Sequence, residues 1–222
     1  MFAMLIMQSC NTSEDQALQT VRNHIKGNLY NPNSYKENSA RIDSIYTTDG
    51  SLDAILGFME VVDMIPEIKS LASKMQSEER TMSIWGDGRV SSLGSQRYSA
   101  AQEKYNVLLK KMNNRKDKIS ERMLCYINDY YEEEQVFAGY YIEISFSGKS
   151  LNGNEVPGYG IYLYSPEQEE IVYEKLLNPV EMLETIVGNG ETMIEKVLEY
   201  VDDYCLSGKE FDVDDFISYV SL

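Results

Sequence analysis

Residues 139–165, GYYIEISFSGKSLNGNEVPGYGIYLYS, decide the fold class of this chain. On each side of a Gly- and Asn-rich connection, bulky apolar residues occupy every second position, over 140–146 and again over 159–163. Successive side chains of a strand point to opposite faces of a sheet, so this period of two predicts two strands. A turn at SPEQEE (165–170) and a third apolar run, IVYEKL (171–176), follow. Three strands with short connections predict an antiparallel β-meander.

An earlier strand and a long helical segment extend this plan. Residues 39–47 (SARIDSIYT) alternate in the same way, which predicts a half-buried strand that joins the meander in one sheet. Residues 51–78 have helical spacing with a break at Pro66, and 96–134 form one long helix or two abutting helices. The Gly- and Ser-rich segment 81–95 (TMSIWGDGRVSSLGS) between them is expected to be a loop.

Helices are also expected near both ends of the chain. Ser13 and Gln16 form a capping-box pattern before apolar residues at helical spacing, which predicts a helix over about 14–27. Pro179 can begin a helix at its first position, and residues 191–204 (ETMIEKVLEYVDDY) predict another. The final stretch, FDVDDFISYV, is either a short amphipathic helix or a loose tail.

These elements predict an α+β fold. An antiparallel β-meander sheet packs with helices, and a long helical insertion at about 51–134 separates the first strand from the meander. We expect residues 14–222 to form a single domain that contains this insertion, because 222 residues suit one domain of ordinary size.

Charge is distributed unevenly along the chain, whose net charge is −16. Residues 1–125 carry 16 Lys and Arg against 15 Asp and Glu, a net charge of +1. Residues 126–222 carry 4 against 21, a net charge of −17. A strongly acidic half repels phosphate backbones, so we expect no nucleic-acid partner. The acidity is otherwise explained by solubility, or by a surface that meets a basic partner.

The opening of the chain, MFAMLIMQSC NTSEDQ, has the layout of a secretory signal followed by a polar tether. Residues 1–9 are uncharged and largely apolar, and the small residue Ser9 precedes Cys10. LIMQSC resembles the lipobox of bacterial lipoproteins, which implies that Cys10 takes up a diacylglycerol and that its amine is acylated after cleavage. Residues 10–13 are then a tether. The alternative is an apolar first turn packed on the domain, with Cys10 a buried thiol.

Two longer segments also resemble small uncharacterised bacterial envelope lipoproteins. They are LYNPNSYKENSARIDSIY (29–46) and GYYIEISFSGKSLNGNEVPGYGIYLYS (139–165). In those proteins a helix, an Asn-Pro-x-Ser-like turn, a strand and a β-meander make one compact domain. The resemblance implies a location at the cell envelope, on the periplasmic or cell-surface side, and brings no catalytic residue with it.

Motifs that carry chemistry are absent or incomplete in the sequence. GKS (148–150) lacks the earlier Gly of a phosphate-binding loop, because position 143 is Glu, and it lies between two strands. DGSLDAILGFME (49–60) has Ala54 where a calcium loop needs Gly. His24 is the only histidine and has no motif around it. We therefore expect no catalytic residue, no metal and no cofactor.

Candidate binding residues are aromatic. Trp85, the only Trp, and Arg89 lie in the Gly-rich segment, where an exposed aromatic side chain is a common recognition device. The alternative is that Trp85 packs into the helical insertion. Tyrosines outnumber phenylalanines 17 to 6, and Tyr141, Tyr162 and Tyr164 could bind a protein or a glycan, or could pack within the sheet.

Cysteine use leaves the redox state open. Three cysteines are too few for a disulfide scaffold. Cys125 and Cys205 either pair, if the chain is exported, or remain as buried thiols.

Two main functions follow as hypotheses. The first is a membrane-tethered, non-enzymatic binding protein. The second is a soluble, cytoplasmic acidic accessory protein, of the inhibitor or immunity type, that binds a basic protein. A hydrolase that uses carboxylates is a third possibility, but no specific motif supports it.

Overall fold

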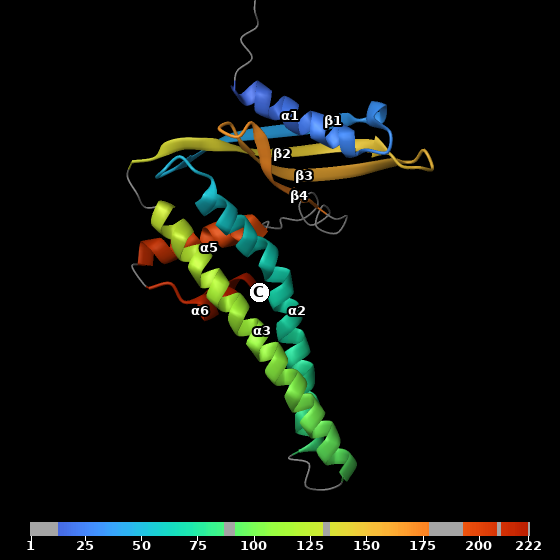
Figure 1. The fold of residues 1–222 in the computed structure, drawn as a ribbon, viewed down its shortest axis with the longest axis vertical. Helices are drawn as coiled ribbons and strands as arrows, with labels where there is room; N and C mark the ends of the chain where they lie inside the picture. Colours follow the sequence, from blue (N-terminus) through green and yellow to red (C-terminus); the bar gives the residue numbers. More distant parts are fainter. Residues whose placement is uncertain (1–12, 87–91, 131–133, 178–192, 208–209, 222) are drawn as a thin grey trace, which may run out of the picture. The chain divides into compact units, whose positions relative to one another are not determined.

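The computed structural model describes residues 13–86, 92–130, 134–177, 193–207 and 210–221 of the chain (Figure 1). The chain divides into two compact units. We call Met1–Leu52 with Glu132–Gly190 the sheet unit, and Asp53–Tyr131 with Glu191–Leu222 the helical unit. The helical unit thus combines the expected insertion with the C-terminal helices.

The sheet unit is built on a four-stranded antiparallel sheet. Its strands are β1 (Lys36–Thr47), β2 (Val136–Lys149), β3 (Glu155–Ser165) and β4 (Glu170–Leu176), in the order β1-β2-β3-β4. This order confirms the predicted meander and the predicted pairing of the first strand with it. It also makes β1 and β4 the two edges of the described sheet.

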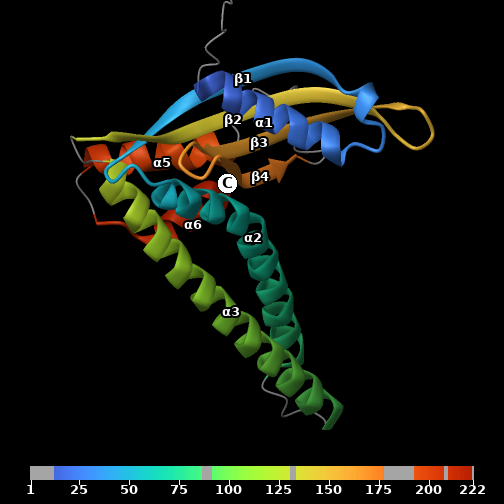
Figure 2. The same cartoon turned by 45° about the horizontal axis from the view of Figure 1, so that its top comes forward.

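Helix α1 (Ser13–Asn28) covers one face of this sheet (Figure 2). The predicted spacing is correct, since Ala17, Val21 and Ile25 form its buried stripe. Against it pack the sheet residues that share this face: Tyr140, Ile142, Ile144, Phe146, Tyr162 and Tyr164. The alternation in β2 is therefore produced by burial under α1, and it fixes the register of this strand because a one-residue slip would move its four apolar side chains off that face. In β3 the predicted alternating residues Ile161 and Leu163 are buried on the opposite face, so this strand is buried on both sides from Gly160 to Ser165.

A short 3-10 helix, η1 (Pro32–Ser34), links α1 to β1. Asn31 caps it by accepting a hydrogen bond from the Asn33 amide at 3.2 Å, and Pro32 occupies the first position, where no amide donor is needed. The Lys149 amide donates to the Ser34 hydroxyl at 2.8 Å. This contact ties the turn to the end of β2.

Arg22 of α1 and Glu37 of β1 form a paired, bidentate contact beside the turn. Arg22 Nε and Nη2 donate to the two carboxylate oxygens of Glu37 at 2.7 Å each, and the Tyr35 hydroxyl donates to the same group at 2.9 Å. Bidentate pairs of this kind are among the stronger hydrogen bonds of proteins. The Arg22 hydrogen bonds, joined by the one from Tyr35, hold the pKa of Glu37 below its usual value of 4.5.

We expect the change Glu37→Gln to cost about 1 kcal/mol of stability near pH 7 and almost nothing in strong acid. A carboxyl with a lowered folded pKa stabilises the fold above its unfolded pKa, and this contribution is lost as the pH falls through the folded value below 4.5. Urea denaturation of both proteins across this range measures the difference. A cost that stays the same at low pH would contradict the linkage.

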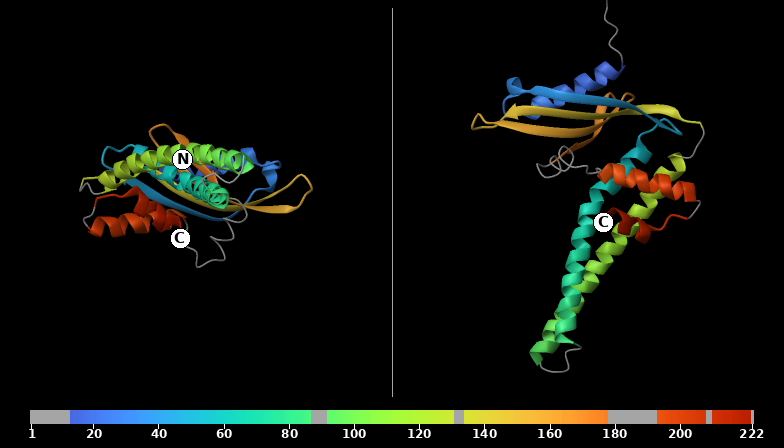
Figure 3. Two further views of the ribbon diagram at one scale, coloured as in Figure 1. Left: turned by 90° about the horizontal axis from the view of Figure 1, so that it is seen from below. Right: turned by 180° about the vertical axis from the view of Figure 1, so that it is seen from behind.

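The helical unit consists of α2 (Asp53–Trp85), α3 (Ser92–Tyr130), α5 (Met193–Ser207) and α6 (Val213–Ser221). Figure 3 shows α5 and α6 beside the antiparallel α2–α3 hairpin. Of the two alternatives for 96–134, one long helix is correct as far as Tyr130. The final stretch is the amphipathic helix rather than a tail, and Asp212 caps it through the Asp214 amide at 2.7 Å. The helix predicted to begin at Pro179 lies outside the described residues.

The predicted loop at 81–95 is wrong in its described parts. Helix α2 continues to Trp85, and α3 already begins at Ser92. The Thr81 hydroxyl donates to the Ser77 carbonyl within the helix, so this β-branched residue is accommodated without ending it. Gly86, with φ of 57°, takes the left-handed conformation that closes a helix C-terminus. Helix α2 therefore ends at a single glycine, Gly86, and not at residue 81, where the Gly- and Ser-rich segment begins.

Pro66 does not break α2. The residue is exposed inside a continuous helix, where it removes one backbone hydrogen bond. Figure 2 shows α2 bending along its length, which is the usual consequence of an interior proline.

The core of the helical unit lies in the part of the hairpin near its open end. Met59 and Ile65 of α2 and Ile119 and Met123 of α3 are fully buried. From residue 72 onwards no described side chain of α2 is buried. No described helix has the length and apolarity needed to cross a membrane.

Candidate functional site

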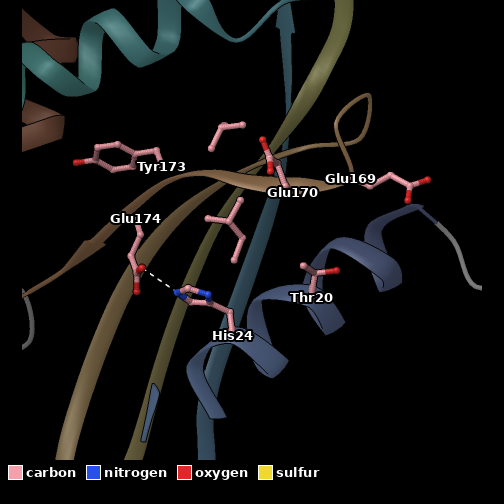
Figure 4. Close-up of a pocket in the computed structure, with 8 residues that line it drawn as sticks. Thr20, His24, Glu169, Glu170, Tyr173 and Glu174 are labelled. Atoms are coloured by element: carbon pink, nitrogen blue, oxygen red, sulfur yellow. Dashed lines mark hydrogen bonds and ion pairs between the residues drawn. The ribbon is translucent and has the colours of Figure 1, made fainter. Parts of the chain in front are cut away.

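An open pocket of about 340 Å³ lies between α1 and β4 in the sheet unit (Figure 4). Thr20 and His24 line it from α1, and residues 169–174 line it from the turn before β4 and from β4 itself. Thr20 and His24 are four residues apart, so they lie on one side of the helix. The pocket therefore combines a helix side with an edge strand of the sheet.

The two walls of the pocket meet in one contact. His24 Nε2 lies 2.8 Å from Glu174 Oε2, and the Asn28 side-chain amide lies 3.0 Å from the same ring nitrogen. Glu174 is paired with Tyr162 across β3 and β4, so its side chain shares the face covered by α1. Figure 4 shows the His24–Glu174 contact bridging helix and strand.

Three carboxylates give the pocket its charge. Glu169, Glu170 and Glu174 all line it, and Glu169 and Glu170 are exposed. Of the three, Glu174 points to His24, while Glu170 points to the other side of β4 (Figure 4). Among the described residues that line the pocket, His24 is the only basic one. A concave site with carboxylates on its wall concentrates negative potential and attracts cations.

Tyr162 lies under this pocket as part of the core. It is fully buried, and its ring meets the His24 ring edge-on with centroids 6.2 Å apart. Among the described residues its hydroxyl has no hydrogen-bond partner of ideal geometry, but it lies beside the Glu174 carboxylate. Burial, followed by the nearby Glu174 carboxylate, raises the pKa of this hydroxyl. The Glu174 carboxylate therefore lies between the Tyr162 hydroxyl and the His24 ring and acts on both.

The tyrosines predicted as binding residues separate into two groups. Tyr162 and Tyr164 are buried under α1 and present no surface to a partner in this structure. Tyr141 is half-buried on the opposite face, where its hydroxyl donates to Glu143 at 2.8 Å. Burial and the Glu143 carboxylate raise the pKa of Tyr141.

Trp85, predicted with Arg89 as a binding residue, contacts an arginine of the next helix. The guanidinium of Arg97, on α3, lies 4.6 Å from the Trp85 ring centre, a cation–π contact across the hairpin. Trp85 is half-buried as the last residue of α2, so it does not belong to a free loop. Arg89 and Cys10 lie outside the described residues.

Cysteines and metal ligands add little to this site. Cys125 is a free, exposed thiol, so the prediction of a buried thiol is wrong for it, while the side chain of Cys205 lies outside the described residues. Asp49, the first residue of the calcium-like pattern, instead accepts a hydrogen bond from the Ser51 amide at 2.8 Å. Within the part of the chain that the structure describes, no three His, Cys, Asp or Glu side chains are grouped as metal ligands.

Comparisons with known proteins give no relationship. No family model, curated protein or solved structure matches the chain. Of the residues that line the α1–β4 pocket, the sequence drew attention only to His24, as the only histidine, and assigned it no site. Its central pair, His24 and Glu174, is separated by 150 residues, and only the strand order brings the two together.

Proposed function

We propose that this protein is a non-enzymatic interaction protein that is held at the bacterial cell envelope by a lipid on Cys10. We propose further that the α1–β4 pocket receives a positively charged side chain of a partner protein. The observation that carries this proposal is the carboxylate-rich wall of the pocket, formed by Glu169, Glu170 and Glu174.

The chemistry of the lining favours binding over catalysis. Thr20 is the only Ser, Thr or Cys that the structure describes in the lining, and its hydroxyl donates to the Gln16 carbonyl of its own helix at 2.9 Å. Its proton is therefore directed at the backbone and not at His24, whereas an activated nucleophile is hydrogen-bonded to its base.

An arginine side chain suits this pocket better than a lysine. A guanidinium has five donors in a planar fork and can engage two carboxylate oxygens at once, while an ammonium acts as a point charge. The pocket is open to solvent, so each carboxylate contact is worth about 1 kcal/mol, near the value for exposed ion pairs. Binding of a single side chain is then weak, and the rest of the partner supplies further affinity.

The pocket is tested with N-acetyl-arginine-methylamide and with its neutral analogue, in which citrulline replaces arginine. In NMR titrations of the full-length chain we expect the arginine ligand to shift the amide signals of Thr20, His24, Glu170 and Glu174. The double change Glu170→Gln and Glu174→Gln should weaken this binding about 10-fold, the equivalent of about 1.4 kcal/mol.

Glu167→Gln provides the matched control. It removes one negative charge, against two in the double variant, from the exposed turn before β4, and Glu167 does not line the pocket. We expect this change to leave the affinity within about 2-fold. Equal shifts with the citrulline ligand, or equal losses from the control, would overturn the proposal.

The second candidate function is the soluble accessory protein that presents acidic helices to a basic partner. Exposed acidic residues on α5, including Asp202 and Asp203, favour it. Part of the acidity is used internally, since Asp214 of α6 pairs with Lys116 of α3. The same titration separates the two functions, because this candidate predicts shifts on α5 and α6 and none at Thr20 or His24.

A further inference from the structure

The geometry points to β4 as the docking edge for an extended partner segment, which adds to the sheet as a fifth strand and places an arginine or lysine in the α1–β4 pocket. This inference rests on the proposed function and names the conformation and composition of the partner. Strand addition is a common mode of peptide recognition, in which backbone hydrogen bonds provide affinity and side-chain pockets provide specificity.

The ladder between β3 and β4 defines which backbone groups are available. The Leu177 amide donates to the Tyr159 carbonyl at 2.9 Å, so this pair is hydrogen-bonded. Hydrogen-bonded and non-hydrogen-bonded pairs alternate along an antiparallel ladder. Glu174 and Leu176, opposite Tyr162 and Gly160, are therefore in non-hydrogen-bonded pairs. Their amides and carbonyls point away from β3, toward the position of a fifth strand.

The side chains of Glu174 and Leu176 indicate which residue types the partner segment should have opposite them. Glu174 and Leu176 are two residues apart with no register shift between them, so their side chains share the face on which α1 lies. Leu176 is 57% exposed. In an antiparallel fifth strand, a basic residue opposite Glu174 would have an apolar residue two positions before it, opposite Leu176. The segment therefore has the pattern apolar, any residue, then Arg or Lys.

Charge and strand shape favour this occupant over others. A second copy of β4 on the same edge would bring Glu170 and Glu174 against the same carboxylates, and like charges across strands are destabilising. Both edges contain bulges, since β1 has two register shifts and β4 has one, between its pairs with Leu163 and Tyr164. Such bulges twist an edge away from further pairing. The β4 edge is regular from Tyr173 to Leu176.

The test uses the peptide acetyl-Thr-Val-Thr-Arg-Thr-Val-amide and two N-methylated forms of it. Docked in this way, the backbone amide of the peptide Arg donates a hydrogen bond to the backbone carbonyl of Glu174. The backbone amide of the preceding Thr points to solvent. We expect the parent peptide to bind the full-length chain at least 10-fold more tightly than N-acetyl-arginine-methylamide. N-methylation at Arg should remove this gain, and N-methylation at the preceding Thr should change affinity by less than 2-fold.

Hydrogen exchange and side-chain changes provide independent readouts. Binding should slow exchange of the Glu174 and Leu176 amides. Leu176→Ala should weaken the peptide about 5-fold, whereas Leu151→Ala, which truncates a leucine that is 74% exposed in the β2–β3 turn, should have no effect.

The outcomes separate the two proposals. If the peptide binds no better than the arginine ligand, or if both N-methylated forms bind equally, strand addition is wrong and the cation pocket stands. If neither ligand binds, the proposed function itself fails. A concentration-dependent dimer of the chain that is dissociated by Leu176→Ala would identify a second copy as the occupant and overturn the inference.

Discussion

Replacing Gly139 by Ala is expected to lower the free energy of unfolding of the sheet unit by about 2–4 kcal/mol. A Cβ at this position would lie 2.5 Å from the backbone carbonyl oxygen of Tyr164 and 3.1 Å from Leu52 Cδ1. Leu52 can shift its side chain, but the carbonyl belongs to β3 and moves only if the β2–β3 pairing opens. A rotamer change cannot relieve a clash with a backbone atom. The pairing of β2 with β3 must therefore distort, and the sheet is destabilised.

Gly27→Ala is the control for this change. Gly27 lies in α1, and a Cβ added there meets no atom within 4 Å. Removing a glycine from a helix should stabilise the unit by up to about 1 kcal/mol. Hydrogen exchange read separately on β2–β3 and on α2–α3 assigns each effect to its unit. If both glycine changes had the same small effect, the close approach at Gly139 would be contradicted.

The strands were the most predictable part of the fold. Alternation at Ile142 and Ile144 arises because one face of β2 packs under α1, whereas β3 is buried on both faces from Gly160 to Ser165. Periodicity gives the existence of two faces but not which of them a helix covers. For this reason Tyr141 and Tyr162 looked equivalent in the sequence, although one is half-buried beside Glu143 and the other is fully buried under α1.

The helix ends were less predictable, because composition and conformation disagree there. Segment 81–95 is rich in Gly and Ser, but only Gly86 among its described glycines has a positive φ. Gly94 is buried inside α3, where a small residue allows close packing. The same residue type thus ends one helix and packs inside the next.

The pocket could not be found from the sequence alone. Thr20 and His24 lie on a helix with an ordinary amphipathic pattern, and Glu170 and Glu174 are two of 36 acidic residues. In so acidic a chain a carboxylate carries little information by itself. The information lies in the strand order, which makes β4 an edge beside α1.

Membrane attachment is the second prediction with a large effect, because it is close to all-or-none. If Cys10 is acylated, the full-length protein should enter the detergent phase in a phase-separation experiment, and Cys10→Ser should leave it soluble or unprocessed. Each buried CH₂ of an acyl chain contributes about 0.8 kcal/mol to membrane binding, so several acyl chains hold a protein firmly at a membrane. A protein without an acyl chain lacks this contribution altogether. Metabolic labelling with a fatty-acid analogue detects the acyl chains directly.

Cys125→Ser is the matched control for the anchor. It removes an exposed free thiol of α3 by the same chemical change, so it tests whether labelling at any accessible cysteine explains the result. We expect this variant to keep both the label and the detergent partition of the wild type. If Cys10→Ser partitions and labels like the wild type, the lipoprotein proposal is wrong. The cation pocket would then belong to a soluble protein, and the accessory-protein function would become the better explanation of its acidity.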